Sequence, residues 1–240
     1  MKRILIALVL MLCIAEISAQ QSVGAETQQI SNPVKQWTSS FTAIDVDAPI
    51  KLTLIPISDN DAPYIVYDTK GNETSKFTAE VDKGHVLKIR ERNDPKRTTT
   101  TEVSVYFNSL TDIKISRANT YVEDVIEGKI IDIVISNDAT FVAQIDVKDL
   151  KISISGNCCV ELSGEALYHT ADVATAKYNA TSLSTMSTIV EAHHNAEVRI
   201  DAEQRLEAKS TTGGKIFYKS EPELLRTEKT LFGVDIAQIK

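Results

Sequence analysis

Hydrophobic and polar residues alternate along the chain from Trp37 onwards, in short runs separated by turn-forming clusters. The clusters at residues 58–61, 69–72 and 82–85 are rich in Ser, Asp, Asn, Lys and Gly. Alternation of this kind points every second side chain to the same face and is typical of half-buried β-strands. Abundant Ile, Val and Thr favour strands further. The pattern therefore predicts an all-β chain of short strands without an amphipathic helix.

A short pattern recurs in the second half of the chain at intervals of 18–20 residues. Residues 113–122 and 133–142 are identical at five of ten positions, and a sixth exchanges Tyr for Phe. Weaker copies begin at Ile152, Ala171, Val190 and Leu206, which makes six copies between about 109 and 218. Each copy has room for two short strands and a turn but not for a ten-residue helix. A fixed period of this length predicts a solenoid.

The predicted fold is a single-stranded, right-handed parallel β-helix with about 18–20 residues per coil. The hand follows from the strong preference of parallel crossovers for right-handed connections. Two inward columns are expected, each with one residue from every coil, and small residues after the turns fit a narrow core. The first column is Ile113, Ile133, Ile152, Ala171 and Val190, the second is Ile115, Ile135, Ile154, Val173 and Ala192, and the small residues are Ala139, Cys158 and Ala196. The predicted turn residues are Ser116, Ser136, Ser155, Gly156, Gly213 and Gly214.

The expected organisation is one domain over residues 37–240. Residues 37–108 form an irregular N-terminal part of short-strand coils and hairpins, 109–222 the repeat coils and 223–240 a C-terminal capping strand with Leu231, Val234 and Ile236. Caps are expected because open ends of a solenoid invite edge pairing. Residues 20–36 are polar and are interpreted as a flexible linker.

Residues 1–19 have the form of a secretory signal peptide. Lys2 and Arg3 are followed by a twelve-residue apolar stretch, and Ile17-Ser18-Ala19 predicts cleavage after Ala19. The predicted location is the periplasm, the outer-membrane surface or the extracellular space. No later apolar run approaches the ~18 residues of a membrane helix, so no transmembrane segment is expected in the mature chain.

The net charge argues against nucleic-acid binding, and the cysteines argue against a fold held by disulfides. The net charge is −7 and the pI about 5.2, so the chain is a poor candidate for nucleic-acid binding, which needs basic side chains. Cys158 and Cys159 are adjacent, and such neighbours close only a strained disulfide ring. One buried and one outward thiol are expected, with vicinal redox chemistry as the alternative. No cofactor is expected.

Asp112 and Asp132 are the strongest indication of enzyme chemistry. Each precedes an inward Ile, so on the β-helix they point outward on neighbouring coils, with Lys151 next in the column. Their separation would be about 5 Å, which suits a retaining glycosidase. The alternative is a solvated ladder in which Lys151 offsets part of the repulsion. The four histidines lack ligand spacing, so surface or turn positions are expected and no metal site is predicted.

Two groups of residues are candidates for binding. Lys88, Arg90 and Arg92, with Lys96 and Arg97, form a basic cluster that suits an anionic polysaccharide or a solvated hairpin face. Thr120 and Thr140 mark outward Ser/Thr-rich faces, which are expected to continue near Thr181 and Thr188. With one Trp and 6% aromatic residues, platforms for stacking sugars should be scarce.

The repeats resemble the GIN-domain family, the auto-transporter adhesin head domains of Bacteroidetes-type bacteria. The likeness rests on the Ile-x-Ile-Ser-Gly-Asn-Cys segment at 152–158, on Gly213-Gly214 and the residues up to Pro222, and on the opening from Phe41 to Leu52. It covers about residues 37–222 and implies a secreted β-helical protein with an adhesion role. Most turns lack the family's Ser-Gly pair, as at Ser116-Arg117, which predicts that some turns do not need a positive φ.

The preferred interpretation is a secreted, non-enzymatic β-helical protein of the surface or periplasm that binds a polysaccharide or a surface protein. A carbohydrate-active hydrolase or lyase is the first alternative. A structural envelope component that associates with copies of itself is the second.

Overall fold

The computed structural model describes residues 31–71, 76–230 and 236–239, and all helical or strand elements within them are β-strands. The predicted leader and its cleavage site after Ala19 lie outside the described residues, as do residues 20–30 of the predicted linker. Residues 34–36, the end of that linker, belong to the first strand. The short strands before the long ones are β1 (Val34–Trp37), β2 (Ala43–Asp47), β3 (Lys51–Pro56), β4 (Tyr64–Asp68), β5 (Thr78–Val81), β6 (Val86–Arg90), β7 (Glu102–Phe107) and β8 (Asp112–Ser116).

Four long strands form the middle of the molecule, and short strands follow them. The long ones are β9 (Asn119–Ser136), β10 (Thr140–Ser155), β11 (Cys159–Ala174) and β12 (Lys177–His193). The later ones are β13 (Glu197–Ile200), β14 (Arg205–Ser210), β15 (Lys215–Tyr218), β16 (Leu224–Lys229) and β17 (Ile236–Gln238).

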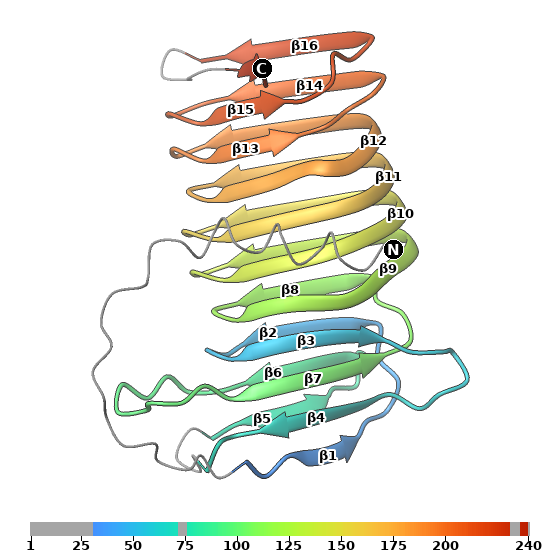
Figure 1. The fold of residues 1–240 in the computed structure, drawn as a ribbon, viewed down its shortest axis with the longest axis vertical. Coiled ribbons are helices and arrows are strands. Elements are labelled where there is room, and N and C mark those ends of the chain that lie inside the picture. The colour runs from blue at the N-terminus through green and yellow to red at the C-terminus, as the bar shows by residue number, and fades with distance from the viewer. Residues whose placement is uncertain (1–30, 72–75, 231–235, 240) are drawn as a thin grey trace, which may run out of the picture.

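The strands stack into a β-solenoid of about six turns (Figure 1). Each long strand bends once, so that its first half lies on one face of the solenoid and its second half on the other. Strand β10 pairs in parallel with β9 on one side and β11 on the other, through both halves. Face 1 is the face that contains the second halves of the long strands together with β8, β14 and β16. Face 2 contains the first halves of the long strands together with β13, β15 and β17. The predicted all-β parallel solenoid is confirmed.

The N-terminal coils do not stack in the order of the sequence. Strand β2 lies between β6 and β8 on face 1, and β3 lies between β7 and β9 on face 2. The coil made by β2 and β3 is therefore enclosed by coils that come later in the chain (Figure 1). Antiparallel strands end the stack here, β5 beside β6 on face 1 and β4 beside β7 on face 2, with β1 outside β4.

The C-terminal end of the stack carries β16 on face 1 and β17 on face 2, paired with β14 and β15. Both belong to the predicted cap at 223–240. Leu231 and Val234 lie outside the described residues, whereas Ile236 packs, partly buried, against the core. All six residues of β16 are exposed.

Both predicted inward columns lie in the core, and each of their residues is at most 2% exposed. Backbone pairing sets them side by side, as with Ile113, Ile133 and Ile152. The small residues Ala139, Cys158 and Ala196 are buried as expected. Stacked β-branched side chains fill the space between the two faces, and burial of each contributes roughly 1.5–3 kcal/mol.

Thr120 faces the core, so its predicted outward position is wrong. Its side chain is 3% exposed and stands in an inward column of face 2 between Leu52 and Phe141. Side chains alternate along a strand, and inward Ala118 two positions earlier fixes the side on which Thr120 lies. The buried Thr120 Oγ1 has no hydrogen-bond partner.

His169 is also buried, whereas surface or turn positions were expected for the histidines. It interrupts an apolar column between Leu150 and Thr188. Its Nε2 lies 2.9 Å from the Tyr178 hydroxyl, and its Nδ1 lies 3.5 Å from Thr188 Oγ1. Thr185 continues the chain, 2.7 Å from Thr188 Oγ1, and donates to the Asp201 carbonyl at 2.7 Å. Burial lowers the pKa of His169 to about 4.

Replacing Thr120 with valine should raise the free energy of unfolding by about 1 kcal/mol, because a buried hydroxyl without a partner is destabilising by roughly 1–3 kcal/mol. Urea denaturation measures the change. Thr185→Val is the matched control: it removes bonded contacts and should lower the unfolding free energy. A less stable Thr120→Val protein would contradict the assignment.

Stability should fall between pH 6.5 and pH 4 through His169. Its folded pKa of about 4 lies below the ordinary value of 6.5. Between these two pH values the histidine is protonated in the unfolded chain and neutral in the native state. The free energy of unfolding is expected to fall by on the order of 2 kcal/mol from pH 7 to pH 5 from this residue alone. Urea titrations of His169→Gln should show a correspondingly smaller fall. Exposed His194→Asn should behave like the unchanged chain, and an identical pH profile for His169→Gln would refute the role of His169.

Candidate binding surface

Asp112 and Asp132 lie opposite each other on face 1, followed by Lys151 in the same column. All three side chains are exposed. Thr111 Oγ1 donates to Asp112 Oδ2 at 2.7 Å. The three residues do not line the hollow near the C-terminal end, which has a volume of about 500 Å³ and is lined by other residues of β12, β14 and β16. The arrangement fits a solvated ladder better than a reaction site, because catalytic carboxylates need contrasting environments to separate their roles.

The basic cluster is largely neutralised by local ion pairs. Lys88 Nζ lies 2.9 Å from Asp82 Oδ2, and Arg90 NH2 lies 2.7 Å from Asp45 Oδ2. Arg97 NH1 lies 2.7 Å from Glu91 Oε1, and both of these side chains are buried. Arg92 and Lys96 are exposed. Because most of its charge is paired, this cluster gives little support to an anion-binding surface.

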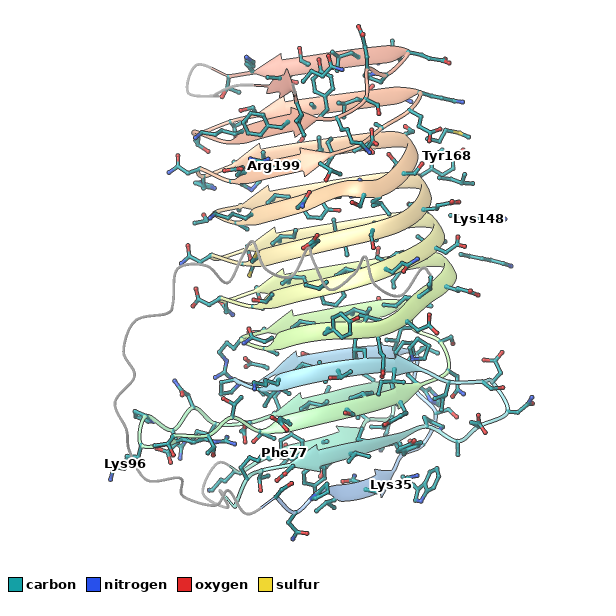
Figure 2. The ribbon with its side chains drawn as sticks, in the orientation of Figure 1. Lys35, Phe77, Lys96, Lys148, Tyr168 and Arg199 are labelled. Atoms are coloured by element: carbon teal, nitrogen blue, oxygen red, sulfur yellow. The ribbon has the colours of Figure 1, made fainter. Side chains whose placement is uncertain are left out.

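Arg97 and Glu91 anchor the loop between β6 and β7, which projects from the solenoid with Lys96 near its tip (Figure 2). Thr101 Oγ1 donates to Glu91 Oε1 at 2.6 Å and accepts a hydrogen bond from Arg97 NH2. Glu91 Oε2 is buried without a hydrogen-bond partner. The pair therefore fixes the base of the loop. Arg97 has this structural role, whereas the sequence placed it in a candidate binding cluster.

The remaining threonine candidates do not form one outward face. Thr140 and Thr181 are half-buried, and Thr181 Oγ1 donates to Asn179 Oδ1 at 2.9 Å. Thr188 is fully buried beside His169. Together with inward Thr120, these positions leave no continuous threonine surface among the described residues.

The predicted turn residues lie along one side of the solenoid, where the coils reverse. Ser116, Ser136 and Ser155 end β8, β9 and β10, and Gly156 follows with φ 78°. Gly213, with φ 84°, and Gly214 lie in the turn between β14 and β15. A Cβ on Gly214 would collide with the carbonyl oxygen of Ala192.

The prediction that some turns without glycine do not need a positive φ is wrong for the turns after β8, β9, β11 and β12. Arg117, Asn137, Thr175 and His194 have φ of 64°, 57°, 56° and 52°. All the turns of the long coils thus use the left-handed region, which most side chains rarely adopt. At Arg117 a side-chain contact accompanies the strain: Nε donates to Asp47 Oδ1 at 2.7 Å. This bond is the main cause that lowers the pKa of Asp47.

Cys158 is buried and Cys159 half-buried, in agreement with the expected inward and outward pair. Cys158 Sγ donates to the Ser155 carbonyl at 3.2 Å. Burial raises the pKa of the Cys158 thiol, which keeps it protonated and weakly reactive at neutral pH.

Three aromatic residues gather on face 2 at the N-terminal end, a feature that composition did not reveal. Trp37, Tyr64 and Tyr106 are cross-strand neighbours on β1, β4 and β7. The Tyr64 and Tyr106 rings stack with centroids 4.1 Å apart, and Trp37 is tilted against Tyr64 at 5.1 Å. Lys35 Nζ lies 4.2 Å from the Trp37 centroid and 3.7 Å from the Tyr64 centroid. We call Lys35, Trp37, Tyr64 and Tyr106 the end aromatic group.

Within the described part of the chain, no helix has the length and apolar character needed to cross a membrane. Those same residues also contain no cluster of three or more His, Cys, Asp or Glu side chains suited to a metal ion.

Solved structures with similar folds come from Bacteroides and Parabacteroides species. A "putative adhesin" from Bacteroides fragilis aligns with a TM-score of 0.76 at 15% identity, covering 87% of this chain and 96% of that one. A "putative adhesin" from Parabacteroides merdae gives 0.65 at 18% identity, with 88% and 96% covered. A "putative lipid binding protein" from Parabacteroides distasonis gives 0.65 at 15% identity, with 88% and 97% covered. At these identities the likeness shows a shared fold.

No curated protein matches the chain. A family model does, the one described as "Putative auto-transporter adhesin, head GIN domain", over residues 40–222. The matched span runs from just before β2 to just before β16, so it includes nearly every coil of the solenoid. The chain therefore belongs to the GIN-domain family of auto-transporter adhesin heads.

Proposed function

We propose that this chain is a secreted, non-enzymatic adhesin-type module that holds a partner by extended contact along the solenoid. The predicted signal peptide supports export. The family description supports adhesion, and two structural relatives are described in the same words. None of these descriptions names a catalytic activity.

The observation that carries the proposal is the register of outward side chains on consecutive coils. On face 1 one such column joins β8 to β14 through backbone pairs, and its members are Lys114, Val134, Ser153, Asp172, Glu191 and Lys209. Neighbouring strands repeat every ~4.8 Å. A linear polymer or an extended protein segment along the stack would meet side chains at that spacing, and many weak contacts would add up.

A carbohydrate-active enzyme remains the first alternative, since Asp112 and Asp132 are neighbours on one face. Its weakness is exposure, because both carboxylates are open to water and share one kind of environment. Self-association is the second alternative. Strand β16 supports it, because its only partner among the described strands is β14 and its Leu224 and Leu225 are 43% and 40% exposed. A strand at the edge of a sheet can pair with a further strand.

The chain without its predicted leader, residues 20–240, should bind saturably to at least one component of an array of glycans and matrix proteins. No reducing sugar should appear in the same wells. Asp112→Asn combined with Asp132→Asn should leave binding within about fivefold of the unchanged chain, since an exposed charge interaction contributes roughly 0–1 kcal/mol. Sugar release that disappears in the double variant would establish the enzyme instead. Absence of binding together with concentration-dependent association in sedimentation would favour the structural component.

A further inference from the structure

The end aromatic group has an exposed ring that the fold does not use. Trp37 is the only tryptophan of the chain and is 62% exposed. It lies on β1, whose only strand partner in the described part of the chain is β4. Tryptophan is usually well buried, and the core of the solenoid lies on the other side of these strands. A large apolar ring held at the end of the molecule is therefore available to a partner.

The position of this ring is fixed before any partner arrives. Lys35 stands over both Trp37 and Tyr64, and Tyr64 is stacked on Tyr106. Figure 2 shows Lys35 on β1 at the end of the stack. Cation–π and ring contacts of this kind restrict the side chains in the unbound protein. A partner that packs on Trp37 consequently immobilises little additional side chain, which favours binding.

Polar groups for hydrogen bonding lie in the loop that leads into Tyr64. The loop between β3 and β4 exposes Asp59, Asn60 and Asp61. It is held in place by the residue that follows β7, because Asn108 Nδ2 donates to the Ser58 carbonyl at 2.7 Å and to the Asp61 carbonyl at 3.0 Å. The loop then leads through Pro63, whose carbonyl accepts from the Thr38 amide at 3.1 Å, directly into Tyr64.

We propose that the end aromatic group and the loop at 58–61 form a binding site for a neutral polysaccharide. This proposal rests on the proposed function and specifies its ligand. The C–H face of a sugar ring packs on Trp37, and the ring hydroxyls bind the carboxylates and amide of the loop. A few convergent polar groups around an apolar surface are the usual composition of a site for small ligand units.

Charge and the size of the exposed surface favour a neutral polysaccharide over acidic polysaccharides, anionic lipids and proteins. Asp59 and Asp61 repel acidic polysaccharides and anionic lipid headgroups, and the charge of Lys35 is directed at the rings. A stable protein interface needs about 800 Å² on each partner with an apolar centre. Here the exposed ring of Trp37 offers a footprint that suits a few sugar units.

The single tryptophan makes the site directly measurable. Residues 20–240 are titrated with soluble neutral glucan, mannan, galactan and xylan, and the emission of Trp37 is followed. Polygalacturonate serves as the acidic control, and phosphatidylcholine–phosphatidylglycerol vesicles as the membrane control. We expect a saturable blue shift with at least one neutral polysaccharide and none with either control. A shift with vesicles alone would overturn the proposal in favour of a membrane contact.

Affinity electrophoresis in gels that contain the same polysaccharide tests the variants without relying on fluorescence. Trp37→Ala should weaken binding about tenfold or more, since one lost aromatic contact plus its buried area is worth a factor of this order. Asp61→Asn and Asn60→Ala should weaken it less. Tyr168→Ala is the matched control: this exposed tyrosine lies at the bend of β11 (Figure 2), and its removal should change nothing. Urea midpoints should be equal for all variants.

The results separate this proposal from the proposed function. Retardation by a neutral polysaccharide that survives Trp37→Ala, without an emission shift, would place binding elsewhere and overturn the site while adhesion stands. Binding to an array protein but to no polysaccharide would do the same. Absence of binding in every assay would overturn both.

Discussion

The backbone ladder between neighbouring coils continues from the strands into the turns, and the rest of the structure depends on this pairing. The amides of Asn137, Gly156 and Thr175 each donate to a carbonyl of the next coil, Ser155, Ala174 or His193, at 3.3 Å. A turn residue reaches this position in the left-handed conformation, which glycine and asparagine adopt readily and threonine does not. The chain accepts that local strain at Thr175 because an unpaired amide between stacked coils would be more destabilising.

Continuous pairing decides on which side of the sheet each residue lies, because alternation along a strand leaves only two sides. The stacked isoleucines of face 1 follow from this rule, and so do the positions of two buried polar residues, Thr120 and His169. Thr120 lies inside because its neighbours two positions away lie inside, although its hydroxyl finds no partner. His169 lies inside at a place where Tyr178 and Thr188 can bond both ring nitrogens. The same rule sets the outward residues, on which binding depends.

The coils were predictable because their evidence is local and repeated. Ile113, Ile133 and Ile152 recur at a nearly constant interval, and a sequence repeat of this length is compatible with few folds. The N-terminal arrangement was not predictable, because β2 pairs with β6 and β8 without a repeated motif to link them. The end aromatic group was not predicted for a related reason. Trp37, Tyr64 and Tyr106 are distant in the sequence and meet only through the antiparallel pairs of β1, β4 and β7. The inward side of Thr120 could have been found by counting from Ala118.

The enclosed coil of β2 and β3 has a consequence for how the chain assembles. During synthesis β2 and β3 emerge before their neighbours on either side. On one side they need β6 and β7, the later of which ends at Phe107, and on the other side they need β8 and the start of β9. Pairing over such separations is slow, because a long loop must close before the contacts form. The coil made by β2 and β3 therefore stays without its neighbouring strands until about half of the chain has been synthesised. Each later coil can pair with the preceding coil as soon as it is synthesised. The N-terminal coils, although synthesised first, are therefore completed no earlier than the middle of the stack.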